Sequence, residues 1–348
     1  MSTSLVTGAT GIVGSHIARA LLDAGHVVRV LVRPVSDRRA IDGMSVELCE
    51  GDVLDPDSVQ AAAEGCTWVF HCAAVFAYSG QSAEAQTDLA VRGTQHVLQA
   101  ASRAGARRAV VTSSSVTLGS TTTAQILNED AVFAEPQPAA YTVSKLRQEE
   151  AAFAAGERLG LEVVAVCPAL VIGGRDHRLG PSNANLVNYL NDPFRSTFLG
   201  GCNVVSAQDV ALAHIVAARR GMPGQRYVAG SENLRWETLH TIVSELAGTF
   251  GPSVLLNHTA AYLAAAAFEA AARLGGRRPM ATRDEARMAC RFHWYSNARL
   301  VALGWSPRPV RQALAEALAW VIDRGHISDT VMARLKLAPE VQAARECG

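Results

Sequence analysis

Short apolar runs alternate, in the first half of the chain, with segments whose apolar residues recur at helical spacing. The first run, 3–7, is followed by a helical pattern at 15–22. Further strands are predicted at 26–32, 45–50, 67–71, 107–112 and 161–166, and helices at 57–64, 86–104 and 141–156. Segment 120–138 is polar and aperiodic, which predicts a loop. The alternation predicts an α/β fold with a doubly wound parallel sheet and right-handed crossovers.

A glycine-rich turn lies between the first predicted strand and the first predicted helix. Gly8 permits a tight turn, Gly11 lets the backbone approach a pyrophosphate, and Gly14 lets the helix lie close to the strand. The helix start also offers free N–H groups and a positive dipole end. A turn without a ligand is the alternative, but its context favours a dinucleotide and a Rossmann-type sheet. The residues expected to bind it here are Thr7, Gly8, Thr10, Gly11, Ile12, Val13 and Gly14.

The regular alternation of strand and helix patterns ends after residue 174. Segment 175–185 is polar and loop-like, and short helices are predicted at 186–190, 209–219, 236–247, 260–274 and 311–324. We expect 1–174 to form the dinucleotide-binding domain. Residues 175–324 would form mainly a smaller α/β substrate-binding portion, with some segments returning to the first domain. Residues 325–348 would be a C-terminal extension, either a docked helix or a partly frayed end.

The end of the second strand bears on the choice of cofactor. Dinucleotide folds place an acidic residue there for NAD or a basic one for the 2′-phosphate of NADP. This strand ends at Arg33, with Arg38 soon after, so NADP(H) is favoured and NAD(H) is the alternative. A solvated surface role for Arg33 stays open. Asp52, followed by Val53, could accept a hydrogen bond from the adenine amino group or could cap a turn.

Composition narrows the range of functions. The chain is 49% hydrophobic and 18% charged with zero net charge, and neither a basic stripe nor a polybasic cluster points to nucleic acid or a lipid surface. Seven scattered cysteines without a Cys-x-x-Cys pair indicate reduced thiols in a cytoplasmic protein, without disulfides or a metal site. The most apolar helical stretch, 260–274, is too short to span a bilayer.

Tyr141 and Lys145 are four residues apart on a predicted helix and therefore project from one face. A free tyrosine has a pKa of about 10, and a nearby ammonium group lowers it toward neutrality. Ser114 follows the end of a strand, on the side of the sheet where ligands bind, and its hydroxyl could hold a substrate oxygen. An exposed Tyr–Lys pair without a role is the alternative reading. The glycine turn and the serine-rich strand end favour acid–base chemistry.

Together these motifs resemble the extended short-chain dehydrogenase/reductase family. The similarity rests on Thr7–Gly14, Thr112-Ser113-Ser114, Tyr141-x-x-x-Lys145 and Pro168–Gly173, and it covers about residues 3–324. Within the family the chain is similar to the dihydroflavonol-4-reductase-like and hopanoid-associated epimerase-like branch. The resemblance implies a catalytic triad of Ser114, Tyr141 and Lys145. The remaining cofactor contacts would come from Cys72, Ala73, Ala74, Thr112, Lys145, Pro168, Ala169, Leu170 and Val171.

The family contains both reductases and epimerases, and the triad does not separate them. The Arg33 pattern favours NADP(H) and net reduction of a ketone or aldehyde on an apolar, ring-bearing small molecule. An NAD-dependent nucleotide-sugar epimerase or dehydratase is the first alternative, and a non-catalytic NADP(H) sensor is the second. Helices 86–104 and 141–156 could pair in a homodimer, as in relatives. The residues expected to line the substrate pocket are Phe76, Tyr78, Ser114, Leu118, Tyr141, Leu170, Tyr189 and Phe198.

Overall fold

A seven-stranded parallel sheet forms the centre of the first half of the chain. The computed structural model describes residues 2–73, 82–275 and 282–346. The strand order is β11-β7-β5-β4-β1-β2-β3, and every neighbouring pair is parallel. The strands are β1 (Thr3–Thr7), β2 (Val27–Val32), β3 (Glu47–Glu50), β4 (Trp68–His71), β5 (Arg108–Thr112), β7 (Glu162–Pro168) and β11 (Arg226–Ala229). This arrangement confirms the predicted doubly wound α/β fold.

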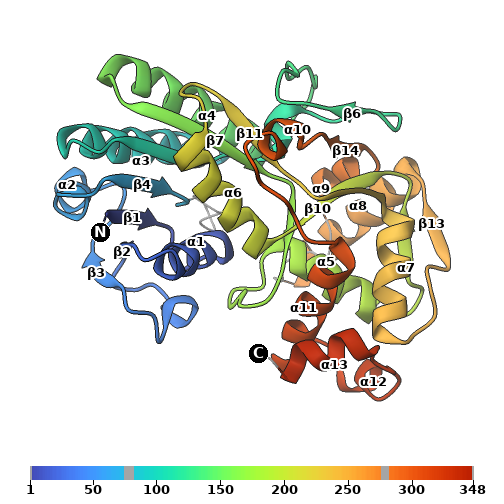
Figure 1. Ribbon diagram of the computed structural model, residues 1–348. Coiled ribbons are helices and arrows are strands. Elements are labelled where there is room, and N and C mark those ends of the chain that lie inside the picture. Colours follow the sequence, from blue (N-terminus) through green and yellow to red (C-terminus); the bar gives the residue numbers. More distant parts are fainter. Residues whose placement is uncertain (1, 74–81, 276–281, 347–348) are drawn as a thin grey trace.

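Helices cover both faces of this sheet (Figure 1). One face carries α1 (Ile12–Asp23) and α6 (Ala207–Arg220), and the other carries α2 (Pro56–Ala63), α3 (Ala83–Arg103) and α4 (Ala140–Leu159). Alternate strand residues therefore enter different cores: Val6 packs with α1 and α6, whereas Leu5 packs with α2 and α3. Because both faces of β4, β5 and β7 are buried, these central strands are mainly apolar rather than alternating with polar residues, whereas the edge strand β3 is largely exposed.

A second sheet with its own core occupies the other side of the molecule. Its order is β12 (Glu232–Arg235), β10 (Gly201–Ser206), β14 (Phe292–Tyr295) and β6 (Ile126–Leu127), with β8 (Leu170–Ile172) paired to β10. A separate parallel pair joins β9 (Ser196–Phe198) to β13 (Val254–Leu256). The helices packed around this core are α5 (Pro181–Asn191), α7 (Trp236–Ala247) and α11 (Val310–Asp323). The chain passes between the sheets, since β6 and β8 lie in the second sheet and β11 returns to the first.

The remaining elements are short or peripheral. Two 3-10 turns, η1 (Arg39–Ile41) and η2 (Ser115–Leu118), follow β2 and β5. Helix α8 (His258–Gly275) packs on α9 (Arg283–Ala289), and α10 (Ala298–Val301) precedes α11. The C-terminal segment forms α12 (Asp329–Met332) and α13 (Pro339–Glu346), which docks on α11 and buries Val341. Across the described ranges, no helix combines the length and apolar character needed to cross a bilayer.

Two loop predictions were wrong in part. Segment 120–138 contains β6, which pairs with β14 through Ile126 and Trp294. A two-residue strand held by a partner so distant in sequence leaves no periodic signal. Segment 175–185 contains the first turn of α5, which begins at Pro181 after Gly180. Proline suits the first helical position because an N–H at this position makes no intrahelical hydrogen bond, so its absence costs nothing. The residues that follow Pro181 are mainly polar, and the apolar spacing of a helix is therefore not visible in this turn.

Candidate active site

The glycine turn has the close contacts that its predicted role requires. Gly8 has φ +74°, and a Cβ there would lie 2.6 Å from the backbone nitrogen of Ala73. A Cβ at Gly14 would lie 2.4 Å from the carbonyl oxygen of Gly8, so only glycine lets α1 pack this closely on the turn. Gly11 caps α1 without a side-chain hydrogen bond, and the first turn of α1 carries no acidic residue. The helix start therefore fits a pyrophosphate.

A buried chain of hydrogen bonds runs from this turn to α4. The Nδ1 atom of His71 lies 2.8 Å from the Thr7 hydroxyl, and its Nε2 atom lies 3.0 Å from the Thr94 hydroxyl. The side-chain amide of Gln148 donates to the same Thr94 oxygen at 3.0 Å. Burial lowers the pKa of His71 to about 3, and the positive charge of Lys145 acts in the same direction. His71 is therefore neutral and holds β1, β4 and α3 together, in agreement with a structural role.

Lys145 stands at the other end of this chain of contacts. Its buried ammonium donates to the Thr112 carbonyl oxygen and to the Gln148 side-chain oxygen, both at 2.9 Å. Burial lowers the pKa of Lys145 to about 8, while the nearby Cys72, Cys167 and Glu149 act to raise it. Lys145 is therefore mainly protonated at neutral pH, and it lies beside the carboxyl end of β5.

Tyr141 lies one helical turn before Lys145, in the first turn of α4. Its side chain is 37% exposed and is hydrogen-bonded to Ser114. Partial burial raises the pKa of Tyr141, and the hydrogen bond from Ser114 opposes that shift. Ser114 is itself buried and caps η2, where its hydroxyl accepts a hydrogen bond from the Val116 N–H. The structure thus brings the phenol and the serine hydroxyl into contact, with a buried ammonium next along the same helix.

Sequence reasoning missed Glu149, although its position carries a signal. It follows Lys145 by four residues, as Lys145 follows Tyr141, so the three side chains lie on one face of α4. Its carboxylate accepts hydrogen bonds from Ser113 and, at 3.3 Å, from Thr117, and it pairs with Arg226 at 3.2 Å. This buried carboxylate therefore joins α4 to the strand end that carries Ser114, to η2 and to β11.

The residues proposed to bind the adenosine part lie at the ends of β2 and β3. Arg33 directly follows β2, and Arg38 pairs with Glu50 of β3 at 2.5 Å. The Oδ1 atom of Asp52 accepts a hydrogen bond from the Leu54 N–H at 3.0 Å, which is the turn-capping arrangement. Val53 packs toward Gly93 of α3, where a Cβ would come within 3.0 Å of it.

The segment expected to pass the nicotinamide is the link between the two sheets. Pro168 ends β7, and the Ala169 N–H donates to the Ala229 carbonyl oxygen at 3.0 Å. Leu170 and Val171 then begin β8 and pair with β10. Cys72 and Ala73 follow β4 at the same edge of the large sheet as Thr112. Ala74 lies outside the described residues.

The predicted substrate-pocket residues separate into two groups. Leu170 and Phe198 are partly buried, and Phe198 meets Trp236 edge to face. Leu118 instead packs in a small core cluster with Cys167 and Val228. Tyr189 is also buried: its ring stacks on His240 at 4.1 Å, and its hydroxyl lies 2.7 Å from that of Ser244. Phe76 and Tyr78 lie outside the described residues.

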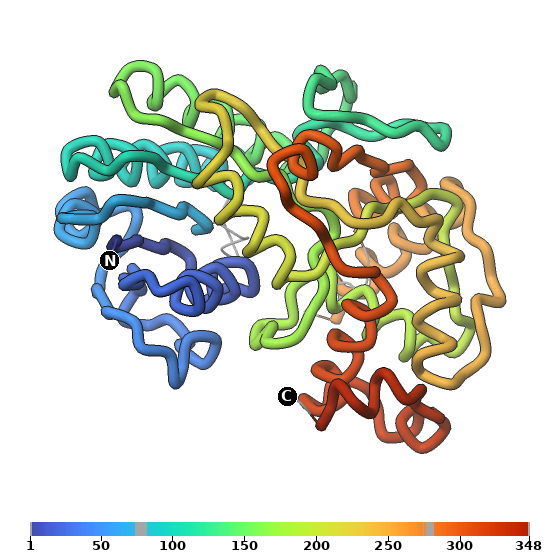
Figure 2. The backbone as a smooth tube through the Cα atoms, in the orientation of Figure 1, coloured from blue at the N-terminus to red at the C-terminus, as the bar shows by residue number. Residues whose placement is uncertain are grey.

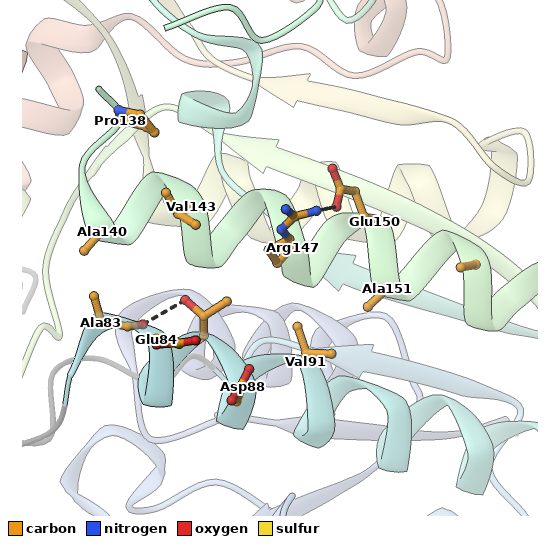
Figure 3. Close-up of a pocket in the computed structure, with 12 residues that line it drawn as sticks. Ala83, Glu84, Asp88, Val91, Pro138, Ala140, Val143, Arg147, Glu150 and Ala151 are labelled. Carbon is orange, nitrogen blue, oxygen red and sulfur yellow. Dashed lines mark hydrogen bonds and ion pairs between the residues drawn. The ribbon is translucent and has the colours of Figure 1, made fainter. Parts of the chain in front are cut away.

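A groove of about 830 Å³ lies away from these groups, between the outer surfaces of α3 and α4 (Figure 3). Val91 and Val143 face it from the two helices, with Arg147 and Glu150 at its border. Tyr141 is not among the residues that line it. Within the described part of the chain, no group of three or more His, Cys, Asp or Glu side chains is placed to hold a metal ion.

Comparison with known proteins agrees with the fold and the motifs. Residues 4–230 match the profile of the NAD dependent epimerase/dehydratase family. The chain is 30% identical over 328 residues to "Putative dihydroflavonol 4-reductase" of Synechocystis sp., covering 92% of this chain and 95% of that protein. It is 30% identical over 338 residues to sterol demethylase protein B of Methylococcus capsulatus, covering 93% and 100% of the two chains.

A solved structure shows the same architecture. The crystal structure of gox2253 superposes with a TM-score of 0.82 at 33% identity, over 94% of this chain and 100% of that one. The match spans both sheets, so the likeness extends well beyond the glycine turn. The chain therefore belongs to the NAD dependent epimerase/dehydratase family, within the extended short-chain dehydrogenases/reductases.

Proposed function

We propose that the protein reduces a ketone or aldehyde to an alcohol with NADP(H), using Tyr141, Lys145 and Ser114. The observation that carries this proposal is the hydrogen bond between Ser114 and Tyr141, one helical turn from the buried Lys145 ammonium. These groups lie where β5 ends, at the edge of the sheet at which ligands bind in doubly wound folds. The glycine turn, whose geometry fits a pyrophosphate, follows β1 at the same edge.

Each residue has a distinct task in this reaction. A bound reduced nicotinamide supplies the hydride to the carbonyl carbon. Tyr141 gives its phenolic proton to the carbonyl oxygen, which becomes the hydroxyl of the product. Ser114 donates a hydrogen bond to that oxygen and so holds it near the phenol. The Lys145 ammonium would stabilise the phenolate that remains, and the hydrogen bond from Ser114 opposes the effect of burial on the pKa of Tyr141.

Arginines support the preference for NADP(H). Arg33 follows β2, where dinucleotide folds meet the adenosine ribose, and no acidic side chain ends that strand. A guanidinium can pair bidentately with a 2′-phosphate, which a carboxylate would repel. Arg38 lies nearby with its charge directed to Glu50. We assign the main 2′-phosphate contact to Arg33 because it directly follows β2, where the adenosine ribose lies in dinucleotide folds.

The substrate is proposed to be an apolar, ring-bearing carbonyl compound. Leu170 leaves the large sheet beside the proposed nicotinamide position, and Phe198 presents an aromatic ring in the second portion. Both side chains are partly exposed and could contact an apolar ring. The names of two relatives, which refer to a dihydroflavonol and a sterol, support the same class.

The decisive experiment compares two adjacent serines and the tyrosine. Purified protein is expected to oxidise NADPH with ketones or aldehydes of this class. Tyr141→Phe should abolish turnover and still bind NADPH, and Ser114→Ala should lower kcat about 10²-fold or more. Ser115→Ala is the matched control and should keep most of the activity. Full turnover by the phenylalanine variant would contradict the mechanism, and NADPH binding without hydride transfer across a broad carbonyl panel would favour a sensor.

We further propose that two copies pair through α3 and α4. The groove between these helices is lined by apolar side chains such as Val91 and Val143, and acidic Glu84 and Asp88 lie across it from Arg147 (Figure 3). Light scattering should give twice the chain mass for the native protein, and Val143→Asp should shift it to the monomer. A native monomer at micromolar concentration would overturn this assembly.

A further inference from the structure

Arg178 connects the second half of the chain to the glycine turn. It lies on the loop between β8 and α5, and its guanidinium donates to the Thr10 hydroxyl at 2.9 Å. Figure 2 shows this loop beside the end of α1 at which the glycine turn lies. A cationic side chain from the second portion therefore reaches the turn that we propose to hold the cofactor phosphates.

The loop that carries Arg178 is fixed by buried polar groups. The Asp176 carboxylate is buried and accepts hydrogen bonds from the Gly180 N–H at 2.7 Å and from the Asn183 side chain at 3.1 Å. Asn183 also donates to the Gly173 carbonyl oxygen at 2.8 Å. These contacts tie both ends of the loop to the start of α5, so the position of Arg178 is prepared before any ligand arrives.

Two residues flanking Arg178 have unusual backbone conformations. Arg175 has φ +61° and Leu179 has φ +47°, and neither is glycine. A left-handed conformation is unfavourable for such side chains and persists only where the surrounding contacts impose it. The strain bends the loop sharply on both sides of Arg178, which is consistent with a loop shaped for a contact.

Positive charge gathers around the start of α1. Burial lowers the pKa of His16 to about 4, against a hydrogen bond to the Ile12 carbonyl oxygen, and the charges of Arg19 and Arg175 lower it further. Arg175 therefore lies close enough to act on α1, on the same loop as Arg178. The dipole of α1 adds to this field at Gly11, so an anion would be attracted here.

We propose that Arg178 binds the pyrophosphate of the dinucleotide, so that the second portion of the chain contributes to cofactor binding. This inference rests on the proposed function. A guanidinium has five N–H donors, and the bond to Thr10 uses one of them. The pyrophosphate is preferred to the 2′-phosphate because Thr10 belongs to the glycine turn, whereas Arg33 stands at the ribose end.

The test measures the affinity of the full-length protein for NADPH and NADH by nucleotide fluorescence, without a substrate. Arg178→Gln should weaken both about tenfold, as expected for loss of a charge-assisted hydrogen bond. Arg178→Lys keeps the charge and should recover part of the loss. Arg158→Gln, at an exposed site near the far end of α4, is the matched control and should change neither affinity by more than about twofold. Raising the salt concentration should reduce the difference in nucleotide affinity between the Arg178→Gln variant and the native protein.

The outcomes separate the two proposals. Native protein that binds neither nucleotide would overturn the proposed function and with it this inference. Native protein that binds, together with an Arg178→Gln variant of equal affinity, would overturn the inference alone. A loss confined to NADPH would place Arg178 at the 2′-phosphate and contradict its assignment to the pyrophosphate. A melting temperature equal to that of the native protein shows that the variant is folded.

Discussion

The Lys145 ammonium donates a hydrogen bond to the backbone carbonyl oxygen of Thr112 at 2.9 Å. This contact ties the second turn of α4 to the last residue of β5, immediately before the serines that follow that strand. The ammonium is buried, so its charge is held in a medium that disfavours it. A residue placed for chemistry should therefore reduce the stability of the fold.

Because burial of the Lys145 ammonium destabilises the fold, we expect the effect of Lys145→Met on the free energy of unfolding to depend on pH. The native pKa of Lys145 is lowered to about 8 from 10.5, so the unfolded chain binds more protons than the folded one between these values. By linkage, the contribution of Lys145 to the free energy of unfolding rises with pH across this window. The native protein should gain about 3 kcal/mol relative to the Met variant between pH 7.5 and 10.5. Urea unfolding at several pH values measures this difference.

The second lysine of the chain provides the control. Lys336 is exposed, so Lys336→Met removes a lysine charge without removing a buried ammonium, and its free energy of unfolding is compared with that of the native protein at the same pH values. Other titrating groups are shared by the native protein and the variants and cancel in the comparison. Parallel stability curves for the native protein and Lys145→Met would show that the ammonium is not disfavoured by burial.

Glu149→Gln should destabilise the protein by about 2 kcal/mol, because it leaves the Arg226 guanidinium without its anionic partner. The double variant Glu149→Gln/Arg226→Met removes both charges and should be less destabilised than the sum of the two single variants. Urea unfolding of all four proteins completes the cycle. Glu150→Gln, beside it but on the exposed face, should change stability by less than about 0.5 kcal/mol. Additive effects in the cycle would contradict the coupling.

The large sheet could be predicted from sequence because its central strands, β4, β5 and β7, are buried on both faces. Residues such as Val164 and Val166 in β7 make continuous apolar runs, and the helices between the strands have regular spacing. Tyr141 and Lys145 could be paired because four residues on a helix fix their relative direction. In both cases the information is local in the sequence.

Contacts between segments that are distant in the sequence produce no local pattern from which they could be predicted. Thr10 and Arg178 are 168 positions apart, and the strand at Ile126 exists only because Trp294 lies beside it. Tyr189 looked like a pocket residue because it is aromatic, but its ring and hydroxyl both have buried partners. Helical spacing alone places Glu149 on the same face of α4 as Tyr141 and Lys145. Its burial could not be predicted in this way, because its partners come from distant segments of the chain.

The cofactor preference can be tested at Arg33. Replacing it with glutamine should weaken NADPH binding about tenfold and leave NADH binding unchanged, because only NADPH carries the 2′-phosphate. Arg39→Gln is the control, since the Arg39 guanidinium already pairs with Asp37 at 2.7 Å. Fluorescence titration of both nucleotides gives the ratio of affinities. An equal loss for NADPH and NADH would place Arg33 elsewhere on the cofactor.

Two glycines of the turn should respond differently to alanine. A Cβ at Gly14 would lie 2.4 Å from the Gly8 carbonyl oxygen, so Gly14→Ala forces α1 away from the turn and should cost about 2 kcal/mol of stability. At Gly11 the nearest atom would be 3.5 Å away and φ is −96°, so Gly11→Ala should fold with nearly native stability. Its methyl group would nevertheless occupy space that we assign to the pyrophosphate, and NADPH affinity should fall. Thermal unfolding and nucleotide titration of the two variants separate the effects, and a Gly11→Ala protein of native affinity would show that the phosphates bind elsewhere.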